Sequence, residues 1–572
     1  MVHLNTTAKD KNTYDAIVIG SGISGGYAAM ELTKKGLKTL VLERGRMIKH
    51  GDYPTATLDK WDFPNRGLLT DEQLAQQAKQ ARTENYTITA ATKDYFVNDI
   101  ENPYTEIKRF DWMRGYHVGG RSLMWGRHCY RWSDLDFEAN AKEGVAIDWP
   151  IRYKDIEPWY DYVEPFVGIS GRAEGLPQLP DGKFLPPIEL NCVEQDFVKS
   201  VAKKFGGRVV TEGRVANLSE RRDIHGSRGQ CQSRNRCMRG CPFGGYFSSN
   251  SATLPVAEAT GNLTIRPMAI VQEIMYDKET KKATGVRIMD AETKEIKEYY
   301  AKIIFCNAST LGSTQILMNS KSERFPDGMG NDSGALGHYL MDHHFKAGAS
   351  ARIEGYEDMY YKGRRPNGIY IPRYRNLNGN AKSNNYTRGF GYQGGAGRSD
   401  WGRLVSEYSF GEELKNEGFT PGQWGIGFTG FGETLPYKEN KVMLNEEVKD
   451  KYGMNTLTFD CEWKENELNM QDAMMNDCAE MLEAAGYKDV SPYKGGSYPG
   501  LGIHEMGTAR MGKDPKTSVL NKYNQIHAVK NVYITDGACM TSSACQNPSI
   551  TYIALTARAC DHAVKELKRQ NL

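Results

Sequence analysis

The chain has 572 residues, which exceeds one ordinary domain and favours two domains that are consecutive or interleaved in the sequence. Hydrophobic residues make up 39% and charged residues 25% of the chain, as in globular proteins that bury a large core. The formal net charge is only +2, and no Lys/Arg block stands out. We therefore expect no nucleic acid partner, because phosphate binding needs a concentrated basic face.

The sequence offers neither a membrane segment nor an export signal. No apolar run reaches the length of a membrane-spanning helix, so we expect no direct membrane span. Residues 1–13 are polar and lack the charged-then-apolar layout of a signal peptide. We expect a cytoplasmic protein, or a periplasmic one that is exported with a partner subunit bearing the signal.

The first predicted elements form a strand–turn–helix–strand unit. Residues 15–20 are a short apolar run of the kind buried in a parallel sheet, 24–35 have helical spacing, and 38–43 predict a second buried strand. The turn between the first strand and the helix is Gly20-Ser-Gly22-Ile-Ser-Gly25. Glycines at this spacing, between a strand and a helix, are typical of dinucleotide-binding folds.

Each glycine of this turn has its own physical role. The first permits the tight turn, the second lets the backbone approach a pyrophosphate, and the third allows the helix to pack closely on the strand. The helix N-terminus, where Ser24 lies, offers unpaired N–H groups and partial positive charge to phosphates. Glu43 ends the next strand and is placed to accept ribose hydroxyls, with Arg44 beside it as a further predicted cofactor contact. The motif alone leaves NAD and FAD open.

The middle of the chain predicts a second sheet-like block and a polar insertion. A helix-forming run at 71–82 precedes it, and strands are predicted at 271–276, 283–289 and 303–306. Residues 354–433 are rich in Gly, Tyr, Asn and Arg with little periodicity. They predict long loops and edge strands over a ligand cleft, with a surface insertion as the alternative.

The C-terminal part predicts an amphipathic helix at 465–485, a strand at 531–535 and a closing helix at 549–568. It also carries two glycine-containing motifs. They are Gly502-Ile-His504-Glu-Met-Gly507-Thr508-Ala-Arg-Met-Gly512, and Thr535-Asp536-Gly537 followed by Gln546-Asn547-Pro548-Ser549. Together with the N-terminal turn, these motifs resemble the glucose–methanol–choline (GMC) oxidoreductases.

The resemblance implies FAD as the cofactor and His504 with Asn547 as the catalytic pair. An Asn as the second residue resembles the pyranose-oxidising and cellobiose-oxidising branches of the family. Asp536 and Gly537 resemble the family's second FAD contact, next to the pyrophosphate and ribityl chain. The remaining cofactor contacts predicted on this basis are Val271, Asn547, Pro548 and Ser549.

These residue types suit the oxidation of an alcohol, in which the O–H proton leaves while the C–H hydride moves to the flavin. A histidine with an ordinary pKa of about 6.5 is partly neutral at pH 7 and can accept the proton. Asn547 can hold the same hydroxyl by hydrogen bonding without competing for that proton. His343 and His344 form a second conspicuous pair, which we expect to be structural histidines near the cleft.

A loop in the N-terminal part resembles the family's loop that packs against the isoalloxazine ring. It reads His117-Val-Gly119-Gly120-Arg-Ser122-Leu-Met124-Trp125-Gly126. The flavin contacts expected there are Gly119, Gly120, Ser122 and Trp125. In branches with a covalently attached flavin, a histidine precedes the matching tryptophan. Met124 stands in that place and cannot form the bond, so non-covalent FAD is predicted. Trp132 is expected to pack in the core.

Three cysteines crowd one loop rich in glycine and arginine. Cys231, Cys237 and Cys241 lie close enough in sequence to converge on one inorganic centre, and a Cys-Pro ending also occurs in iron–sulfur loops. Three close ligands suit a three-iron cluster better than tetrahedral zinc. Structural zinc, inert thiols and a four-iron cluster with a distant fourth cysteine stay open. The spacing resembles that in catalytic subunits of bacterial FAD-dependent glucose dehydrogenases, which implies a [3Fe–4S] centre.

Such a cluster favours a dehydrogenase, because an iron–sulfur relay passes electrons to an external acceptor. We predict an FAD-dependent dehydrogenase that oxidises a hydroxyl of a sugar or glycoside, with C3 favoured as in the glucoside 3-dehydrogenases. The alternatives are an oxygen-using GMC oxidase, a glucose 1-dehydrogenase or another polyol dehydrogenase. The resemblance also implies a small subunit and a cytochrome or other electron acceptor as partners.

The predicted fold class is α/β, with a doubly wound Rossmann-like FAD-binding domain and a discontinuous, mixed-sheet (α+β) substrate domain. The FAD-binding parts are predicted at 1–150, at 225–345 with the iron–sulfur loop, and at 500–572 with the catalytic pair. The substrate parts are predicted at 151–224 and 346–499.

Overall fold

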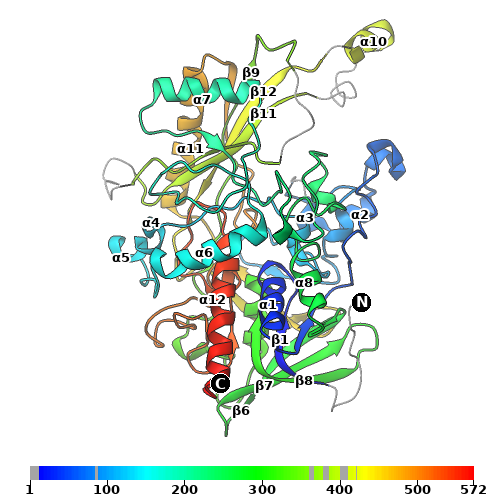
Figure 1. Cartoon of the computed structure of the whole chain (residues 1–572), viewed down its shortest axis with the longest axis vertical. Helices are drawn as coiled ribbons and strands as arrows, with labels where there is room; N and C mark the ends of the chain where they lie inside the picture. The colour runs from blue at the N-terminus through cyan, green and yellow to red at the C-terminus, as the bar shows by residue number, and fades with distance from the viewer. Residues whose placement is uncertain (1–11, 84–87, 360–365, 378–384, 400–409, 420) are drawn as a thin grey trace.

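Two large sheets, one of seven strands and one of six, form the framework of the protein in the computed structural model (Figure 1). A third sheet has three strands in the order β13-β14-β3. The structure describes residues 12–83, 88–359, 366–377, 385–399, 410–419 and 421–572. Within these residues no helix combines the length and the apolar character needed to cross a membrane.

The bounds of the elements are as follows. The helices are α1 (Ile23–Lys34), α2 (Asp71–Gln76), α3 (Ala78–Ala81), α4 (Asp134–Phe137), α5 (Ala139–Glu143), α6 (Tyr153–Val167), α7 (Cys192–Lys204), α8 (Thr253–Ala259), α9 (Thr310–Asn319), α10 (Gly411–Phe419), α11 (Glu465–Ala484) and α12 (Ser549–Lys568). The strands are β1 (Thr13–Ile19), β2 (Thr39–Leu42), β3 (Thr105–Glu106), β4 (Thr211–Glu212), β5 (Leu263–Arg266), β6 (Ala269–Asp277), β7 (Lys282–Asp290), β8 (Ile296–Cys306), β9 (Ala347–Ile353), β10 (Ile369–Ile371), β11 (Phe390–Arg398), β12 (Trp424–Gly432), β13 (Lys441–Lys449), β14 (Asn455–Asp460), β15 (Lys488–Lys494) and β16 (Val532–Tyr533).

The seven-stranded sheet has the order β5-β2-β1-β8-β7-β6, and β16 also pairs with β8. Strands β5, β2, β1, β8 and β16 run parallel, whereas β7 and β6 extend one edge in antiparallel pairing. All four residues of β2 and the last four of β1 are buried. Continuous apolar runs of this kind are typical of parallel strands that are covered on both faces. They place β1 at the centre of a doubly wound sheet.

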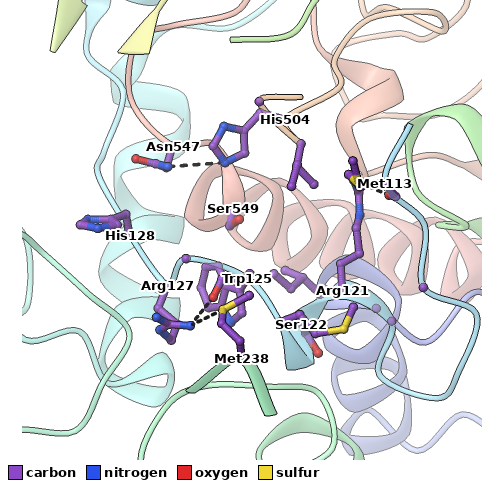
Figure 2. A pocket seen from close by; sticks show the side chains of 18 of the residues that line it. Met113, Arg121, Ser122, Trp125, Arg127, His128, Met238, His504, Asn547 and Ser549 are labelled. Carbon is purple, nitrogen blue, oxygen red and sulfur yellow. Dashed lines mark hydrogen bonds between the residues drawn. The ribbon is translucent and has the colours of Figure 1, made fainter. Parts of the chain in front are cut away.

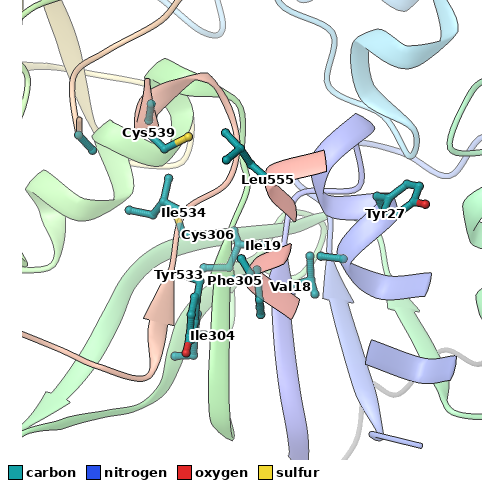
Figure 3. Close-up of a cluster of buried hydrophobic side chains, with 14 of the residues drawn as sticks. Val18, Ile19, Tyr27, Ile304, Phe305, Cys306, Tyr533, Ile534, Cys539 and Leu555 are labelled. Carbon is teal, nitrogen blue, oxygen red and sulfur yellow. The ribbon is translucent and has the colours of Figure 1, made fainter. Parts of the chain in front are cut away.

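Helix α1 packs on β1, β2 and β8, with α8 and α12 on its two flanks (Figure 1). Figure 3 shows the core beneath these helices, where side chains of β1, β8, β16 and α12 meet. The rings of Phe305 and Tyr533 stack with centroids 5.0 Å apart, Ile19 and Leu555 lie beside them, and Tyr27 lies farther off on α1. Chain segments from both ends of the sequence therefore build one core.

The six-stranded sheet is antiparallel, with the order β15-β9-β12-β11-β10-β4. Helix α11 covers β9, β12 and β15, and α7 packs against α11 and β11. Residues of β12 alternate between buried and half-buried. The buried set faces α11, since the two sides of a strand point to opposite faces of the sheet. The other face of the sheet is free to line a cavity.

Most predicted elements of the parallel sheet are confirmed, and two predictions elsewhere are corrected. The predicted helix at 71–82 is two short helices, α2 and α3, because Gln77 leaves the helical conformation with φ −127°. The prediction of edge strands for 354–433 is wrong for β11 and β12, which are inner strands of the six-stranded sheet. Parts of that segment, at 360–365, 378–384, 400–409 and 420, lie outside the described residues.

Candidate active site

A cavity of about 1380 Å³ extends from the carboxyl end of β1 to the inner strands β11 and β12. Pockets for one drug-sized ligand measure roughly 300–1,000 Å³, so this cavity has room for a large cofactor together with a substrate. The predicted site residues that line it are Gly20, Gly22, Ser24, Glu43, Arg44, Gly120, Ser122, Trp125, Cys237, Val271, His504, Asp536, Gly537, Asn547 and Ser549. The predicted residues outside its lining are Gly25, Gly119, Cys231, Cys241 and Pro548.

The glycine turn at the end of β1 has the geometry that a phosphate cradle needs. Gly20 has φ +90°, and a Cβ there would lie 2.4 Å from the carbonyl oxygen of Asn307. A Cβ on Gly25 would lie 2.0 Å from the Gly20 carbonyl oxygen, so only glycine lets α1 start this close to β1. A Cβ on Gly22 would meet nothing within 4 Å, because this residue faces the open cavity.

The start of α1 and its surroundings offer unused hydrogen-bond donors. Gly22 caps the helix, and no described side chain bonds the N–H groups of its first turn as a cap. Buried Asn307 lines the cavity, and its Nδ2 has no partner among the described residues. Ser24 uses its hydroxyl to donate to the Thr535 carbonyl at 3.3 Å, so its contribution to a ligand is its backbone N–H. These donors and the helix dipole favour an anion such as a pyrophosphate.

Glu43 and Arg44 lie where β2 ends. The Glu43 carboxylate accepts from the Ser21 hydroxyl at 2.6 Å and from the Gly45 N–H at 3.0 Å. Oε2 also accepts from the Ser21 N–H at 3.1 Å, so a ribose hydroxyl can use the further lone pair of Oε1. Burial raises the pKa of Glu43, while its hydrogen bonds from Ser21 and the backbone oppose that shift. Arg44 pairs with Asp450 and therefore borders the cavity as part of an ion pair.

The predicted flavin loop closes over the glycine turn. Gly119 has φ +93° and donates its N–H to the Ser21 hydroxyl at 2.9 Å. A Cβ on Gly120 would lie 3.4 Å from the Cα of Gly22, which brings the two loops into direct contact. Ser122 and Trp125 project from this loop and lie below His504 and Asn547 in Figure 2, with Ser549 drawn between. The Trp125 indole donates to the Phe247 carbonyl at 2.9 Å, which fixes the plane of the ring.

His504 and Asn547 meet at one wall of the cavity (Figure 2). The His504 Nε2 and the Asn547 Nδ2 lie 3.4 Å apart. His504 follows Ile503, which has φ +58°, and its backbone N–H donates to Asp342 at 2.9 Å. Asn547 precedes α12, and its Oδ1 accepts from the Gln393 Nε2 of β11 at 2.6 Å. Two other parts of the chain, at Asp342 and at Gln393, thus hold the pair in place.

His343 belongs to the same cluster through a contact with His504 that the sequence did not predict, and its structural role stays a prediction. Its Nδ1 lies 2.9 Å from the His504 Nδ1, and its Nε2 contacts the Ala544 carbonyl. The ring of His344 turns away toward Trp463, at a centroid distance of 5.9 Å. His344 is buried outside the cavity lining, as a structural residue should be.

The electrostatics of the cluster favour neutral histidines. Burial lowers the pKa of His504 well below its ordinary value, and the charges of His343, Arg121 and His128 add to that shift. Burial also lowers the pKa of His343 to about 4. Burial and then Glu505 raise the pKa of Asp342 to about 8, against its backbone hydrogen bonds. A neutral imidazole is the form that can accept a proton.

Two cavity residues were not found from the sequence. Arg121 forms a bidentate pair with Glu505, with donor–acceptor distances of 2.9 and 2.8 Å. His128 faces the same space from the other side in Figure 2, and its Nδ1 lies 2.8 Å from the Tyr130 hydroxyl. Burial lowers the pKa of His128 to about 3, with Arg127 adding to the shift. Their position one to three residues from predicted flavin contacts was a signal that could have found them.

Asp536 and Gly537 close the cavity next to α9. The Asp536 carboxylate accepts from the Ser313 hydroxyl at 2.6 Å and from the Ala538 N–H at 3.0 Å. Burial raises its pKa to about 6, and these bonds oppose the rise. A Cβ on Gly537 would lie 2.2 Å from the Glu505 carbonyl oxygen, so the close approach requires glycine. Trp132 is fully buried against Trp149, which confirms its predicted place in the core.

The three clustered cysteines are half-buried and unpaired in disulfides. Cys237 begins a short 3-10 helix (Cys237–Arg239) and lines the cavity. Burial raises the pKa of Cys231, and the charges of Cys237 and Cys241 add to the rise. In the described part of the chain, no three His, Cys, Asp or Glu side chains converge on a position for a single metal ion.

A doubly wound sheet with a glycine turn, a cavity at the ends of its strands and a buried His–Asn pair define an α/β oxidoreductase with a dinucleotide-type cofactor site. The chain belongs to the GMC oxidoreductase family, because residues 14–345 match its N-terminal model and residues 436–556 its C-terminal model. Members of this family bind FAD.

The chain is similar to relatives along almost its whole length. It is 28% identical to 2-methyl-1,2-propanediol dehydrogenase of Mycolicibacterium austroafricanum, over 97% of this chain and 96% of the relative. It is 26% identical to the fructose dehydrogenase large subunit of Gluconobacter japonicus, over 97% of this chain and 98% of that subunit. The structure of pyridoxine 4-oxidase from Mesorbium loti has the same fold, with a TM-score of 0.57, 15% identity and coverage of 96% and 99% of the two chains.

Proposed function

We propose that this protein is an FAD-dependent dehydrogenase that oxidises a hydroxyl of a sugar or glycoside. The proposal depends above all on the His504–Asn547 pair, whose Nε2 and Nδ2 atoms lie 3.4 Å apart at the cavity that the glycine turn also lines. A base and an amide that meet at one point can bind the same hydroxyl and remove its proton.

The chain's own residues divide the work of the reaction. FAD, when bound, supplies the acceptor for the hydride. The glycine turn and α1 would hold its pyrophosphate, and Glu43 a ribose hydroxyl. Asn547 would donate to the substrate oxygen and orient it, while His504 takes the O–H proton at Nε2. General-base catalysis of this kind contributes roughly 10²–10⁴-fold to a rate.

The substrate class rests on resemblance and on relatives. The two similar proteins named above are by name dehydrogenases, one of a diol and one of fructose. We favour C3 of a glucoside as the oxidised carbon, giving a 3-keto sugar, on the resemblance to glucoside 3-dehydrogenases. A glucose 1-dehydrogenase that yields a lactone, or a dehydrogenase of another polyol, would use the same pair of residues on a different carbon.

We further propose that Cys231, Cys237 and Cys241 bind an iron–sulfur cluster of the [3Fe–4S] type. Cysteine thiolates of one loop are the ligands that such clusters take. Half-burial of all three thiols and the place of Cys237 at the cavity support this assignment. Arg228 adds support: burial lowers the pKa of this guanidinium to about 9, and a negative charge on Cys241 opposes that shift.

A cluster at this loop would give electrons a way out to a partner. We propose a small subunit and a cytochrome or similar acceptor in that role, which suits a protein exported to the periplasm with its partner. The similarity to a protein named a large subunit supports this. An oxygen-using oxidase is the competing function, and it has no need of the three cysteines.

A visible absorption spectrum of the purified protein, before and after anaerobic addition of glucose or methyl glucoside, tests both proposals. We expect flavin bands over a broad iron–sulfur background, and bleaching of the flavin bands by the sugar. Bleaching without the broad background, together with rapid peroxide formation in air, would replace the dehydrogenase by an oxidase. Both cofactors without bleaching would overturn the sugar assignment and direct the search to other polyols.

A further inference from the structure

We propose that His343 is a positioning residue, which determines which ring nitrogen of His504 carries the proton. The proposal rests on the proposed role of His504 as the base. It follows from a row of polar contacts that runs from the Ala544 carbonyl through His343 and His504 to Asn547. Nothing in the sequence motifs assigns a role to His343 in the reaction.

The direction of the row is set at the Ala544 end. A carbonyl oxygen can only accept a hydrogen bond, so the His343 Nε2 that contacts it must carry a proton. A neutral imidazole has one N–H, and the other nitrogen is an acceptor. The Nδ1 of His343 therefore presents a lone pair.

That lone pair points at His504. The two Nδ1 atoms lie 2.9 Å apart, with the rings close to perpendicular at 76°. Since His343 accepts through Nδ1, His504 must donate through its own Nδ1. The single N–H of neutral His504 is then used, and its Nε2 keeps a lone pair on the side of Asn547 and the cavity, as Figure 2 shows.

The far end of the row agrees with this direction. Gln393 donates from Nε2 to the Asn547 Oδ1 at 2.6 Å, so the Asn547 amide turns its NH₂ group toward His504. The donor Nδ2 faces the Nε2 lone pair at 3.4 Å, without a clash of two donors. The opposite tautomer of His504 would set N–H against N–H at Asn547 and lone pair against lone pair at His343.

The imidazole rings of His343 and His504 are neutral because of their surroundings. Burial is the main cause that lowers the pKa of both His343 and His504. Arg121 is the cation near His504, and its charge disfavours a second positive charge on the ring. The carboxylate of Asp342 bonds to the backbone N–H of His504.

The functional consequence concerns the proton of the substrate. With Nδ1–H donated to His343, the Nε2 of His504 is ready to accept a proton from a hydroxyl at the cavity wall. In the other tautomer the same atom would carry a hydrogen and would have to exchange it before it could act as a base. His343 therefore keeps the base in its working form between turnovers.

The first test is ¹⁵N NMR of the wild-type holoenzyme labelled at histidine, with His504 assigned through its variant. We expect the shift of a protonated Nδ1 and an unprotonated Nε2. A protonated Nε2 would overturn the proposal, whether or not His504 is the base. A His504→Ala variant with unchanged turnover would instead overturn the proposed function and leave the tautomer finding intact.

A pair of nearly isosteric variants tests the same point by kinetics. His343→Asn keeps an acceptor near the position of Nδ1, whereas His343→Leu removes it. In anaerobic flavin reduction we expect His343→Leu to be slower by about 10²-fold or more, and His343→Asn to recover most of the rate. His344→Leu is the matched control, because His344 is equally buried and its ring lies against Trp463 instead. Equal losses in all three variants would mean that His343 only fills space.

Discussion

Gln393 donates a hydrogen bond of 2.6 Å to the Asn547 amide oxygen, although the two residues lie 154 positions apart in the chain. The bond joins inner strand β11 of the six-stranded sheet to the turn that precedes α12. It occupies the one oxygen of the Asn547 side chain, so that the NH₂ group is left for His504 and a substrate. The six-stranded sheet thus sets the orientation of a residue in the turn before α12.

Replacement of Gln393 should therefore disturb the reaction more than the binding of FAD. In Gln393→Leu the Asn547 amide loses its partner and is free to turn, and loss of one hydrogen bond of about 1 kcal/mol corresponds to a roughly fivefold slower flavin reduction. Gln393→Glu should be slower still, because a carboxylate facing Oδ1 repels it and favours the turned amide. Anaerobic stopped-flow measurement of flavin reduction gives both rates.

The FAD content of both Gln393 variants should equal that of the wild type, since Gln393 lies beyond the glycine turn on the substrate side. If Gln393→Glu reduced its flavin as fast as the wild type, the orientation of Asn547 would have no bearing on the chemistry.

The lowered pKa of His504 predicts an activity that persists in mild acid. Below its pKa a histidine is protonated and cannot act as a base, so activity is lost as pH falls through that value. An ordinary histidine would lose half of its activity at a pH of about 6.5. Because burial lowers the pKa of His504 well below that value, we expect kcat/KM to stay level from pH 8 through 6.5 and to fall only in stronger acid.

The matched variant for this profile is His504→Ala, for which we expect a loss of roughly 10²–10⁴-fold in flavin reduction with FAD still bound. The small residual rate of this variant should not fall in acid, because the group that becomes protonated there is absent. A wild-type profile with its midpoint near pH 6.5 would show that His504 is more accessible to protons in solution than its burial implies.

The local patterns of the sequence predicted the parallel sheet well, for a physical reason. The apolar run of β1, the glycine turn and the helical spacing of α1 act within a few residues, and α12 has the predicted bounds. The inner strands β11 and β12 were missed because glycine has low strand propensity and no side chain to show a pattern. Their glycines serve the packing: a Cβ on Gly430 would lie 2.5 Å from Met474 of α11.

The site residues that lie within sequence motifs were predicted. Contacts that form only when distant parts of the chain fold together were not. His504 and Asn547 were found from their motifs, and the structure brings them together. The contact between His343 and His504 joins residues 161 positions apart. The local spacing of residues in a sequence does not indicate a contact over such a distance. The division of the chain into five domain parts stays a prediction.

Buried histidines also predict how stability depends on pH. Burial lowers the pKa of His344 to about 3, whereas an unfolded histidine titrates at about 6.5. Between these values His344 is protonated in the unfolded chain and neutral in the folded chain. The unfolding free energy therefore decreases as pH falls, by up to about 1.4 kcal/mol per pH unit. The unfolding temperature of wild type and His344→Leu, compared from pH 7 to 4.5, measures this contribution.

His344→Leu should be the less stable protein at pH 7, because its packing against Trp463 is altered, and its deficit should shrink as the pH falls. Carboxylates titrate alike in both proteins and cancel in the comparison. A deficit that stays constant over this range would show that His344 is protonated in the folded state.

The residue before Trp125 predicts how the flavin is held. Met124 is buried and lines the cavity, and a thioether cannot form the bond that a histidine forms in covalent flavoproteins. Acid precipitation of the purified protein should therefore leave the pellet white and release all FAD into the supernatant, where its absorbance is measured. Met124→Leu should behave in the same way. A yellow pellet would show that another residue binds the flavin covalently.

Replacement of a cysteine in the loop should affect electron transfer to the acceptor but not the reduction of the flavin by the substrate. Cys237→Ala should lose iron and acid-labile sulfide, because a cluster of three irons needs all three thiolates, and it should keep its FAD. Anaerobic reduction of the flavin by sugar should persist, since His504 and Asn547 are untouched, while turnover with a one-electron acceptor protein falls to a small fraction.

Cys192→Ala is the matched control, because Cys192 is also half-buried and free but lies on α7, outside the loop. Wild-type protein purified without air that contains neither iron nor sulfide would remove the cluster from the proposed function and leave the His504–Asn547 chemistry standing.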